Sequence, residues 1–217
     1  RSQNKTKAHV YGTGPLIEKA FFSDPSGKFN VICNSIVKNE RLVQHINPDL
    51  LVFADPVFHF SPCEYAKTFR KNAYKVMTDY ECYVVIPETA VPLLLAHYPK
   101  YREKIIGIPV EGGRGLFNFP SLDRFFVRAT ANILTLYMLP IASSIASEIT
   151  IYGCDGRKPD ETYFWKHHGD TQYTELMKTV FDMHPSFFRD RSYEEYYEEH
   201  CELLEQILQF RESLGKS

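Results

Sequence analysis

Six short apolar segments, separated by stretches with helical periodicity, constrain the fold of this chain more than any other feature. Each segment is rich in β-branched or aromatic residues, as expected of strands buried on both faces of a parallel sheet. They span residues 9–11, 29–33, 50–54, 83–86, 105–110 and 149–152, and the crossover helices are expected at 16–22, 64–74, 90–97 and 130–144. The pattern therefore predicts an α/β fold with a doubly wound, mostly parallel sheet.

Length and composition favour a single domain. A chain of 217 residues that is 44% hydrophobic can bury one sizeable core. We expect residues 1–155 to form the sheet core, and residues 156–217 to add a lid segment and a C-terminal helix. The lid is predicted because the aromatic and His-rich stretch from residue 162 to 170 has no clean periodicity.

A capping box, from Ser192 to Glu195, predicts the start of the C-terminal helix. The face of this helix that we expect to pack inward carries Tyr196, Tyr197, His200, Leu204, Ile207 and Leu208.

Charge and cysteine content exclude several classes of partner. The formal net charge of −2 provides no general attraction to a polyanion, so no nucleic-acid partner is expected. The five cysteines are odd in number and include no CxxC pair, which indicates free thiols in a reducing compartment. No apolar run reaches the roughly 18 residues of a membrane helix. We expect a cytoplasmic protein, and peripheral association with the inner face of a membrane stays open, as does the oligomeric state.

Small and polar residues follow four of the six apolar segments. They read Gly12-Thr13-Gly14-Pro15, Asn34-Ser35, Asp55-Pro56 and Gly153-Cys154-Asp155-Gly156. Ligands of open α/β sheets bind beyond the carboxyl ends of the strands, so we expect these residues to line one crevice. Donors and acceptors gathered in this way suit a nucleotide. A single Asn or Asp after a strand also serves as a turn or capping residue, and that alternative stays open.

The first of these turns predicts a phosphate site. Gly12 and Gly14 can adopt positive φ and lack a Cβ, and Pro15 suits the first turn of a helix whose N–H groups favour an anion. The full GxGxxG spacing is missing, because Ile17 stands where the third glycine would be. A purely structural strand-to-helix turn is therefore the alternative.

The adjacent His167 and His168 are the one feature that suggests a metal site. Adjacent side chains point apart on a strand or helix, and no carboxylate or cysteine stands at ligand spacing. We therefore expect neither a metal nor another cofactor.

The order of these motifs resembles that of the bacterial sialyltransferases of glycosyltransferase family 42. It is similar, more loosely, to the related Rossmann-like domain of unknown function that includes archaeal pterin diphosphokinases. The resemblance spans nearly the whole chain through short motifs. It implies a Rossmann-like fold and the metal-independent transfer of sialic acid, or a related 2-keto sugar acid, from a CMP-activated donor to a glycan acceptor.

The resemblance also assigns nucleotide-binding residues. The family's Gly-Asn-Gly-Pro-Ser turn appears here with Thr13 in place of the Asn, the Asn after the second strand is kept as Asn34, and Asp55 replaces the Asn of an Asn-Pro pair. The helix start that meets the phosphate, Thr-Ser-Gly in the family, reads Thr130-Ala131-Asn132. The last strand's motif adds Gly153 and Asp155.

Three further residues receive catalytic roles from the resemblance. Tyr163 corresponds to one of two phosphate-binding tyrosines, Arg157 substitutes for the other as a charged donor, and His184 corresponds to the catalytic histidine. Hydroxyls and helix N–H groups can stabilise a departing nucleoside monophosphate without a metal, and a histidine suits removal of the acceptor's proton at neutral pH.

Two other functions remain open. Phosphoryl or pyrophosphoryl transfer on the same fold would need Mg²⁺ held by carboxylates such as Asp55 and Asp155. A nucleotide-binding domain without turnover is favoured if the Thr130-Ala131-Asn132 helix start does not hold phosphate.

Overall fold

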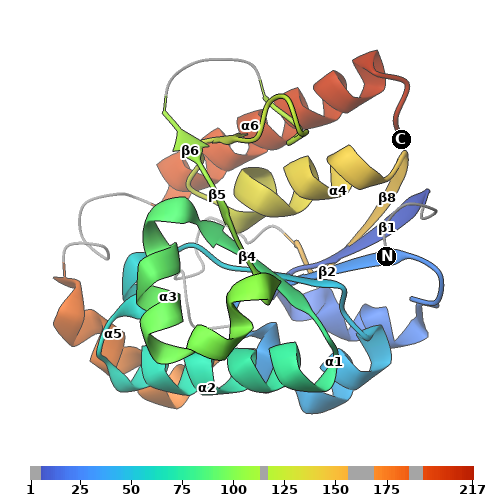
Figure 1. The fold of residues 1–217 in the computed structure, drawn as a ribbon. Helices are drawn as coiled ribbons and strands as arrows, with labels where there is room; N and C mark the ends of the chain where they lie inside the picture. The colour runs from blue at the N-terminus through green and yellow to red at the C-terminus, as the bar shows by residue number, and fades with distance from the viewer. Residues whose placement is uncertain (1–5, 113–116, 156–168, 186–192) are drawn as a thin grey trace.

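The protein is described by a computed structural model that covers residues 6–112, 117–155, 169–185 and 193–217. Its centre is a parallel sheet with the strand order β5-β4-β3-β2-β1-β8 (Figure 1). The strands are β1 (Lys7–Tyr11), β2 (Phe29–Cys33), β3 (Leu50–Val52), β4 (Tyr83–Pro87), β5 (Ile105–Ile108) and β8 (Glu148–Tyr152). The predicted α/β, doubly wound sheet is confirmed.

The direction in which the chain crosses the sheet reverses at β1. From β1 the chain steps through β2, β3, β4 and β5 to one edge, and it then returns to place β8 on the other side of β1. Val10 in β1 accordingly lies opposite both Val31 and Ile151. Such a reversal leaves a crevice at the carboxyl ends of the strands on either side of it.

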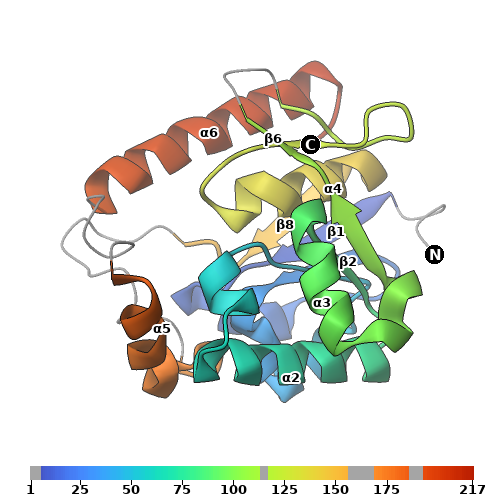
Figure 2. The same ribbon diagram turned by 60° about the vertical axis from the view of Figure 1, so that its left-hand side comes forward.

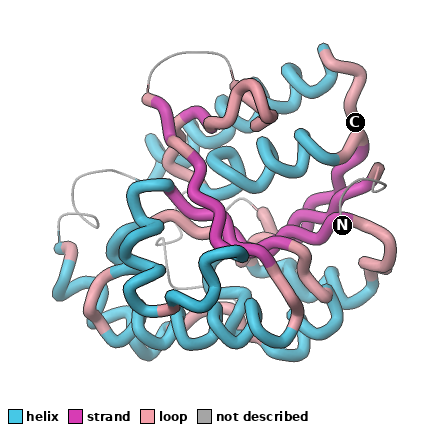
Figure 3. Tube along the Cα trace, viewed as in Figure 1, coloured by secondary structure: helices cyan, strands magenta, loops and turns pink. Residues whose placement is uncertain are grey.

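Helices cover both faces of the sheet (Figures 1 and 2). One layer contains α1 (Glu40–Ile46), α2 (Glu64–Asp79), α3 (Val91–His97) and α5 (Met177–Met183), and the other contains α4 (Leu139–Ile145) and α6 (Tyr193–Ser213). Figure 3 shows the strands as the middle layer between these helices.

Alternating side chains of the strands build two cores. Val31 and Val52 are fully buried in the core that contains α4, whereas Ile32 and Leu51 are fully buried in the core that contains α2. Successive side chains of a strand point to opposite faces, so strands that are apolar at every position need helices on both sides. This explains the short continuous apolar segments of the sequence.

Several predicted elements form with altered bounds. The helix expected at 16–22 is a 3₁₀ helix, Pro15–Phe22, and the helix expected at 64–74 continues to Asp79. The strand expected at 105–110 is interrupted by Pro109, which has no N–H to donate to a sheet. The two residues beyond it, β6 (Val110–Glu111), pair instead with β7 (Val127–Arg128).

Helix α1 was not predicted. It has seven residues, too few to show clear periodicity. The Asn39 side chain accepts the N–H of Leu42 at its start, and Asn47, with φ of 48°, ends it. Both asparagines act as ordinary helix caps.

The region expected to form a lid differs from the prediction where it is described. Tyr173, Met177 and Val180 are buried in the core shared with α2, so residues 169–185 belong to the body of the domain. The other parts of the predicted lid, residues 156–168 and 186–192, lie outside the described residues.

Candidate functional site

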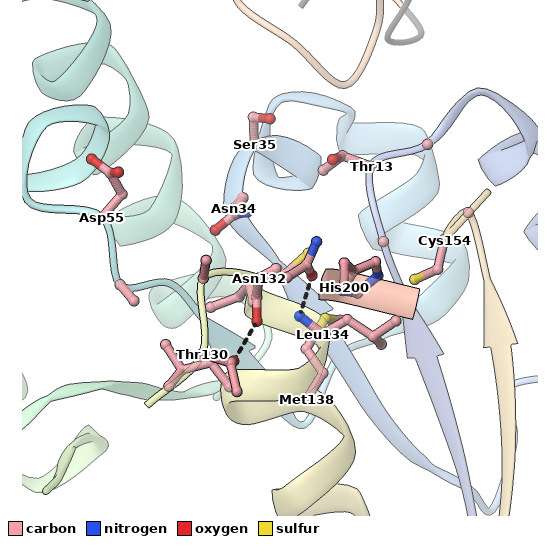
Figure 4. Close-up of a pocket in the computed structure, with 18 of the residues that line it drawn as sticks. Thr13, Asn34, Ser35, Asp55, Thr130, Asn132, Leu134, Met138, Cys154 and His200 are labelled. Carbon is pink, nitrogen blue, oxygen red and sulfur yellow. Dashed lines mark hydrogen bonds between the residues drawn. The ribbon is translucent and has the colours of Figure 1, made fainter. Parts of the chain in front are cut away.

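A cavity of about 450 Å³ lies at the carboxyl ends of β1, β2, β3 and β8, where the sheet reverses direction (Figure 4). One face of α6 and the helix start that precedes α4 complete its walls. Its position matches the crevice predicted from the sequence, and its volume falls in the range of small-molecule sites.

The turn after β1 is held by the loop after β8. The N–H of Gly12 donates to Tyr152 O at 2.8 Å, that of Gly14 to Gly153 O at 2.7 Å, and that of Leu16 to Asp155 Oδ2 at 2.7 Å. All three N–H groups donate within the protein, and the one of Leu16 belongs to the helix start that the sequence predicted for a phosphate. The turn contributes the side chain of Thr13 to the cavity wall (Figure 4).

Gly12 and Gly14 are required for close packing. Neither has positive φ, so that part of the prediction is wrong. A Cβ on Gly12 would lie 2.4 Å from Gly153 O, and a Cβ on Gly14 would lie 2.7 Å from the same oxygen. Positive φ occurs at Gly153 itself, where φ is 62°. The missing Cβ atoms thus let the loop after β8 approach the turn.

Asn34 follows β2 with a left-handed backbone, φ 47°, which asparagine tolerates better than most residues. Its Oδ1 is buried without a hydrogen-bond partner, and so is Oγ of the neighbouring Ser35. Both residues line the cavity. An unpaired buried acceptor costs about 1–3 kcal/mol, so a ligand that donates a hydrogen bond here recovers this cost.

Asp55 follows β3 and caps a π-helical turn, Pro56–Phe60. Its Oδ1 accepts the N–H groups of Val57 and Phe58, both at 2.8 Å, which leaves Oδ2 outside the cap. Burial raises the pKa of Asp55, while the two N–H donors and the charge of His184 act in the opposite direction. Asp55 lines the cavity with part of its carboxylate available to a ligand.

His184, the predicted base, stands at the C-terminal end of α5, and its N–H donates to Val180 O at 2.9 Å. It does not belong to the lining of the cavity in the structure. Its charge nevertheless lowers the pKa of Asp55, so His184 lies near the Asp55 end of the site.

The predicted phosphate-binding helix start, Thr130, Ala131 and Asn132, lines the cavity. Oδ1 of Asn132 accepts the N–H of Leu134 at 2.9 Å, and its Nδ2 donates to the hydroxyl of Tyr196 on α6, also at 2.9 Å. The helix that begins here has its N-terminus at the cavity, where the helix dipole favours an anion.

This helix start also contains an irregular turn. Residues Leu134–Met138 form a π-helical segment before α4. Both π-helical segments of the described chain, this one and Pro56–Phe60, therefore contribute residues to the cavity. Such segments are rare and frequently occur at functional sites.

The predicted inner face of α6 lies against the cavity. The lining residues of this helix are Tyr196, Tyr197, His200, Cys201 and Leu204. The ring of His200 stacks with that of Tyr196, its Nδ1 is buried without a hydrogen-bond partner, and burial lowers its pKa. Ile207 is buried in the core, but Leu208 is 40% exposed, so the prediction that Leu208 packs inward is wrong.

The cavity residues that sequence reasoning missed include His59, Tyr65 and Gln172, whose side chains can form hydrogen bonds. His59 is 4% exposed among the rings of Phe53 and Phe69, and burial lowers its pKa to about 3. The only sequence feature that could have indicated a role for His59 is the run of aromatic residues in which it lies. Tyr65 lies in the apolar pattern of α2, and Gln172 follows a stretch without periodicity.

The cavity has an apolar part and a polar part (Figure 4). The apolar part lies under α6 and contains Leu134, Met138 and Leu204. The polar part lies at the ends of β2 and β3 and contains, among others, Asn34 and Asp55.

Two predicted site residues, Arg157 and Tyr163, lie outside the described residues, as do His167 and His168. Among the residues that the structure describes, no three His, Cys, Asp or Glu side chains are arranged to hold a metal ion. In the same part of the chain, no helix combines the length and apolar character needed to span a membrane.

Comparison with models of protein families, with curated proteins and with solved structures found no match to this chain.

Proposed function

We propose that this protein is a glycosyltransferase that moves a sugar, sialic acid or a related 2-keto sugar acid, from a CMP-activated donor to a glycan acceptor. The observation that carries the proposal is Asn34, whose left-handed backbone places an amide in the cavity with a buried, unpaired Oδ1. A strained residue with an unsatisfied acceptor at the reversal of a parallel sheet is a feature of ligand sites.

The two parts of the cavity suit the two parts of a nucleotide sugar. The apolar surface of Leu134, Met138 and Leu204 suits a flat base, and the start of the helix at Asn132 suits a phosphate. Hydroxyl groups of the sugar match the polar end, where Asn34 and Asp55 supply donors and acceptors.

In the proposed reaction the acceptor's hydroxyl oxygen forms a bond to the anomeric carbon of the donor sugar. The bond from that carbon to the phosphate oxygen breaks, and its electron pair leaves with CMP. His184 takes the proton of the attacking hydroxyl. The nearness of His184 to Asp55 supports this role, because a carboxylate stabilises the imidazolium that results.

Phosphotransfer is less well supported than sugar transfer. It would need the carboxylates of Asp55 and Asp155 for Mg²⁺. Oδ1 of Asp55 accepts the N–H groups of Val57 and Phe58. Oδ2 of Asp155 accepts the N–H of Leu16. These contacts compete with a cation for the same oxygens.

Thermal unfolding with CMP, UDP, GDP and ATP, each with and without Mg²⁺, tests the proposal. CMP at a hundred times its Kd should add roughly 2.7 kcal/mol of stability and raise Tm without Mg²⁺. Stabilisation by ATP with Mg²⁺, and none by CMP, would instead favour the phosphotransferase.

A matched pair of variants links stabilisation by the sugar nucleotide to the cavity. Asn34→Gly keeps the left-handed backbone but removes the amide at the polar end, and it should reduce the Tm shift produced by CMP-N-acetylneuraminate, whose sugar reaches that end. Asn47→Gly makes the same change at the end of α1, where φ is 48°, and should retain the shift. Equal shifts in both variants would show that Asn34 does not contact the sugar.

A further inference from the structure

We propose that Gln172 binds the sugar part of the ligand and helps to determine which sugar the cavity accepts. This inference rests on the proposed function, since it assumes a nucleotide-sugar ligand. It assigns a role to a residue that no sequence motif marks.

The side-chain amide of Gln172 is held in one orientation. Gln172 is 8% exposed and lines the cavity. Its Oε1 accepts the hydroxyl of Tyr65 at 3.0 Å, and Tyr65 is itself 3% exposed. The amide nitrogen, Nε2, meets no acceptor in the described part of the chain. The amide is therefore set to present its two N–H donors to the cavity.

The backbone around Gln172 is fixed as well. Lys38 Nζ donates to the carbonyl oxygens of Gly169, at 3.0 Å, and of Gln172 itself, at 2.5 Å. Asn72 Nδ2 donates to the hydroxyl of Tyr173 at 2.8 Å. Anchors on both sides hold the segment in place, so Gln172 is positioned before a ligand binds.

The surroundings of Gln172 suit hydroxyl groups. Tyr65 is close enough to Ser35 and Asp55 for both to influence its pKa, which places these residues at the same end of the cavity. A sugar hydroxyl both donates and accepts a hydrogen bond. Nε2 of Gln172 can donate to such a hydroxyl, while the unpaired Oγ of Ser35 or the carboxylate of Asp55 accepts from it.

Binding measurements with two probes test this assignment. The parent protein should bind CMP-N-acetylneuraminate more tightly than CMP, because only the former fills the polar end. Gln172→Leu should weaken binding of the CMP-sugar by about tenfold and leave the Kd of CMP nearly unchanged. Tyr65→Phe, which frees the amide, should cause a smaller loss of the same kind.

Two further variants separate recognition from a loss of structure. Gln172→Glu keeps the shape but replaces the donors with a carboxylate, and it should also weaken only the CMP-sugar. Tyr173→Phe weakens the neighbouring anchor without altering a cavity residue, and it should leave both Kd values near those of the parent.

The outcomes distinguish this inference from the proposed function. Failure of the parent protein to bind CMP would overturn the proposed function and with it the inference. If the parent binds CMP, the inference alone is overturned by equal affinity for the two probes, by unchanged CMP-sugar affinity in both Gln172 variants, or by equal losses for the two probes.

Discussion

The carboxylate of Asp155 accepts the backbone N–H of Leu16 at 2.7 Å and so ties the loop after β8 to the first turn of the helix after β1. The two residues are 139 positions apart in the chain. The contact takes the place that the sequence predicted for a bound phosphate. A helix N-terminus attracts an anion, and here the protein supplies one from its own side chain.

Loss of this carboxylate should destabilise the fold. We expect Asp155→Ala to lower the free energy of unfolding by about 1–2 kcal/mol, the usual effect of removing a side chain that caps a helix start. Denaturant unfolding provides the measurement. Asp123→Ala, at an exposed carboxylate, is the matched control, and equal stabilities of the two variants would contradict the structural role of Asp155.

Gly12→Ala should destabilise the protein through steric overlap. The added Cβ would meet Gly153 O at 2.4 Å and Cys154 Sγ at 2.6 Å, which forces the turn and the loop apart. We expect a loss of about 1–3 kcal/mol in the free energy of unfolding. Gly112→Ala adds the same atom with no described residue within 4 Å and should change stability little. A Gly12→Ala protein as stable as the parent would show that the turn has room for a side chain.

His59 should make the protein less stable as the pH falls. Burial lowers its pKa to about 3 in the folded protein from an ordinary value of 6.5. Between these values the unfolded chain binds a proton that the folded chain does not, so stability decreases from near pH 6.5 downward.

A variant tests this pH dependence. His59→Leu should reduce the slope of the unfolding free energy against pH by up to roughly 1 kcal/mol per pH unit. The measurement is chemical denaturation at several values between about pH 4 and pH 6. His97→Leu, at an exposed position on α3, is the control for loss of an imidazole. An unchanged slope in His59→Leu would mean that the folded protein binds a proton at His59 as readily as the unfolded chain does.

His184→Ala should separate catalysis from binding. If His184 takes the acceptor's proton, turnover should fall by about 10² to 10⁴ while the Kd of CMP stays near that of the parent. Loss of the nearby positive charge should also raise the pKa of Asp55 further. Steady-state kinetics with a CMP-sugar and a glycan acceptor, beside His97→Ala, provide the measurement. Parental turnover in His184→Ala would exclude it as the essential base.

Local patterns in the sequence determined the class of fold and the place of the site. Apolar segments such as 50–54 have no polar position, and only a sheet covered on both faces buries such a strand completely. Because parallel strands end at a common edge, Asn34, Asp55 and Gly153 could be placed around one cavity from the strands that they follow. Helix α1 escaped prediction because seven residues carry too little periodicity.

The tertiary structure alone decided what several of these residues do. The glycine turn was identified correctly as a tight turn, but its N–H groups proved to bind the loop of Gly153 and Asp155. The orientation of Gln172 depends on Tyr65, which is 107 residues away. Contacts of this kind join segments whose separation in the chain is set by the whole topology, and they leave no periodicity or spacing in the sequence. The sequence therefore identified polar side chains that line the cavity, and the packing of distant segments determined which of their polar atoms are already hydrogen-bonded within the protein.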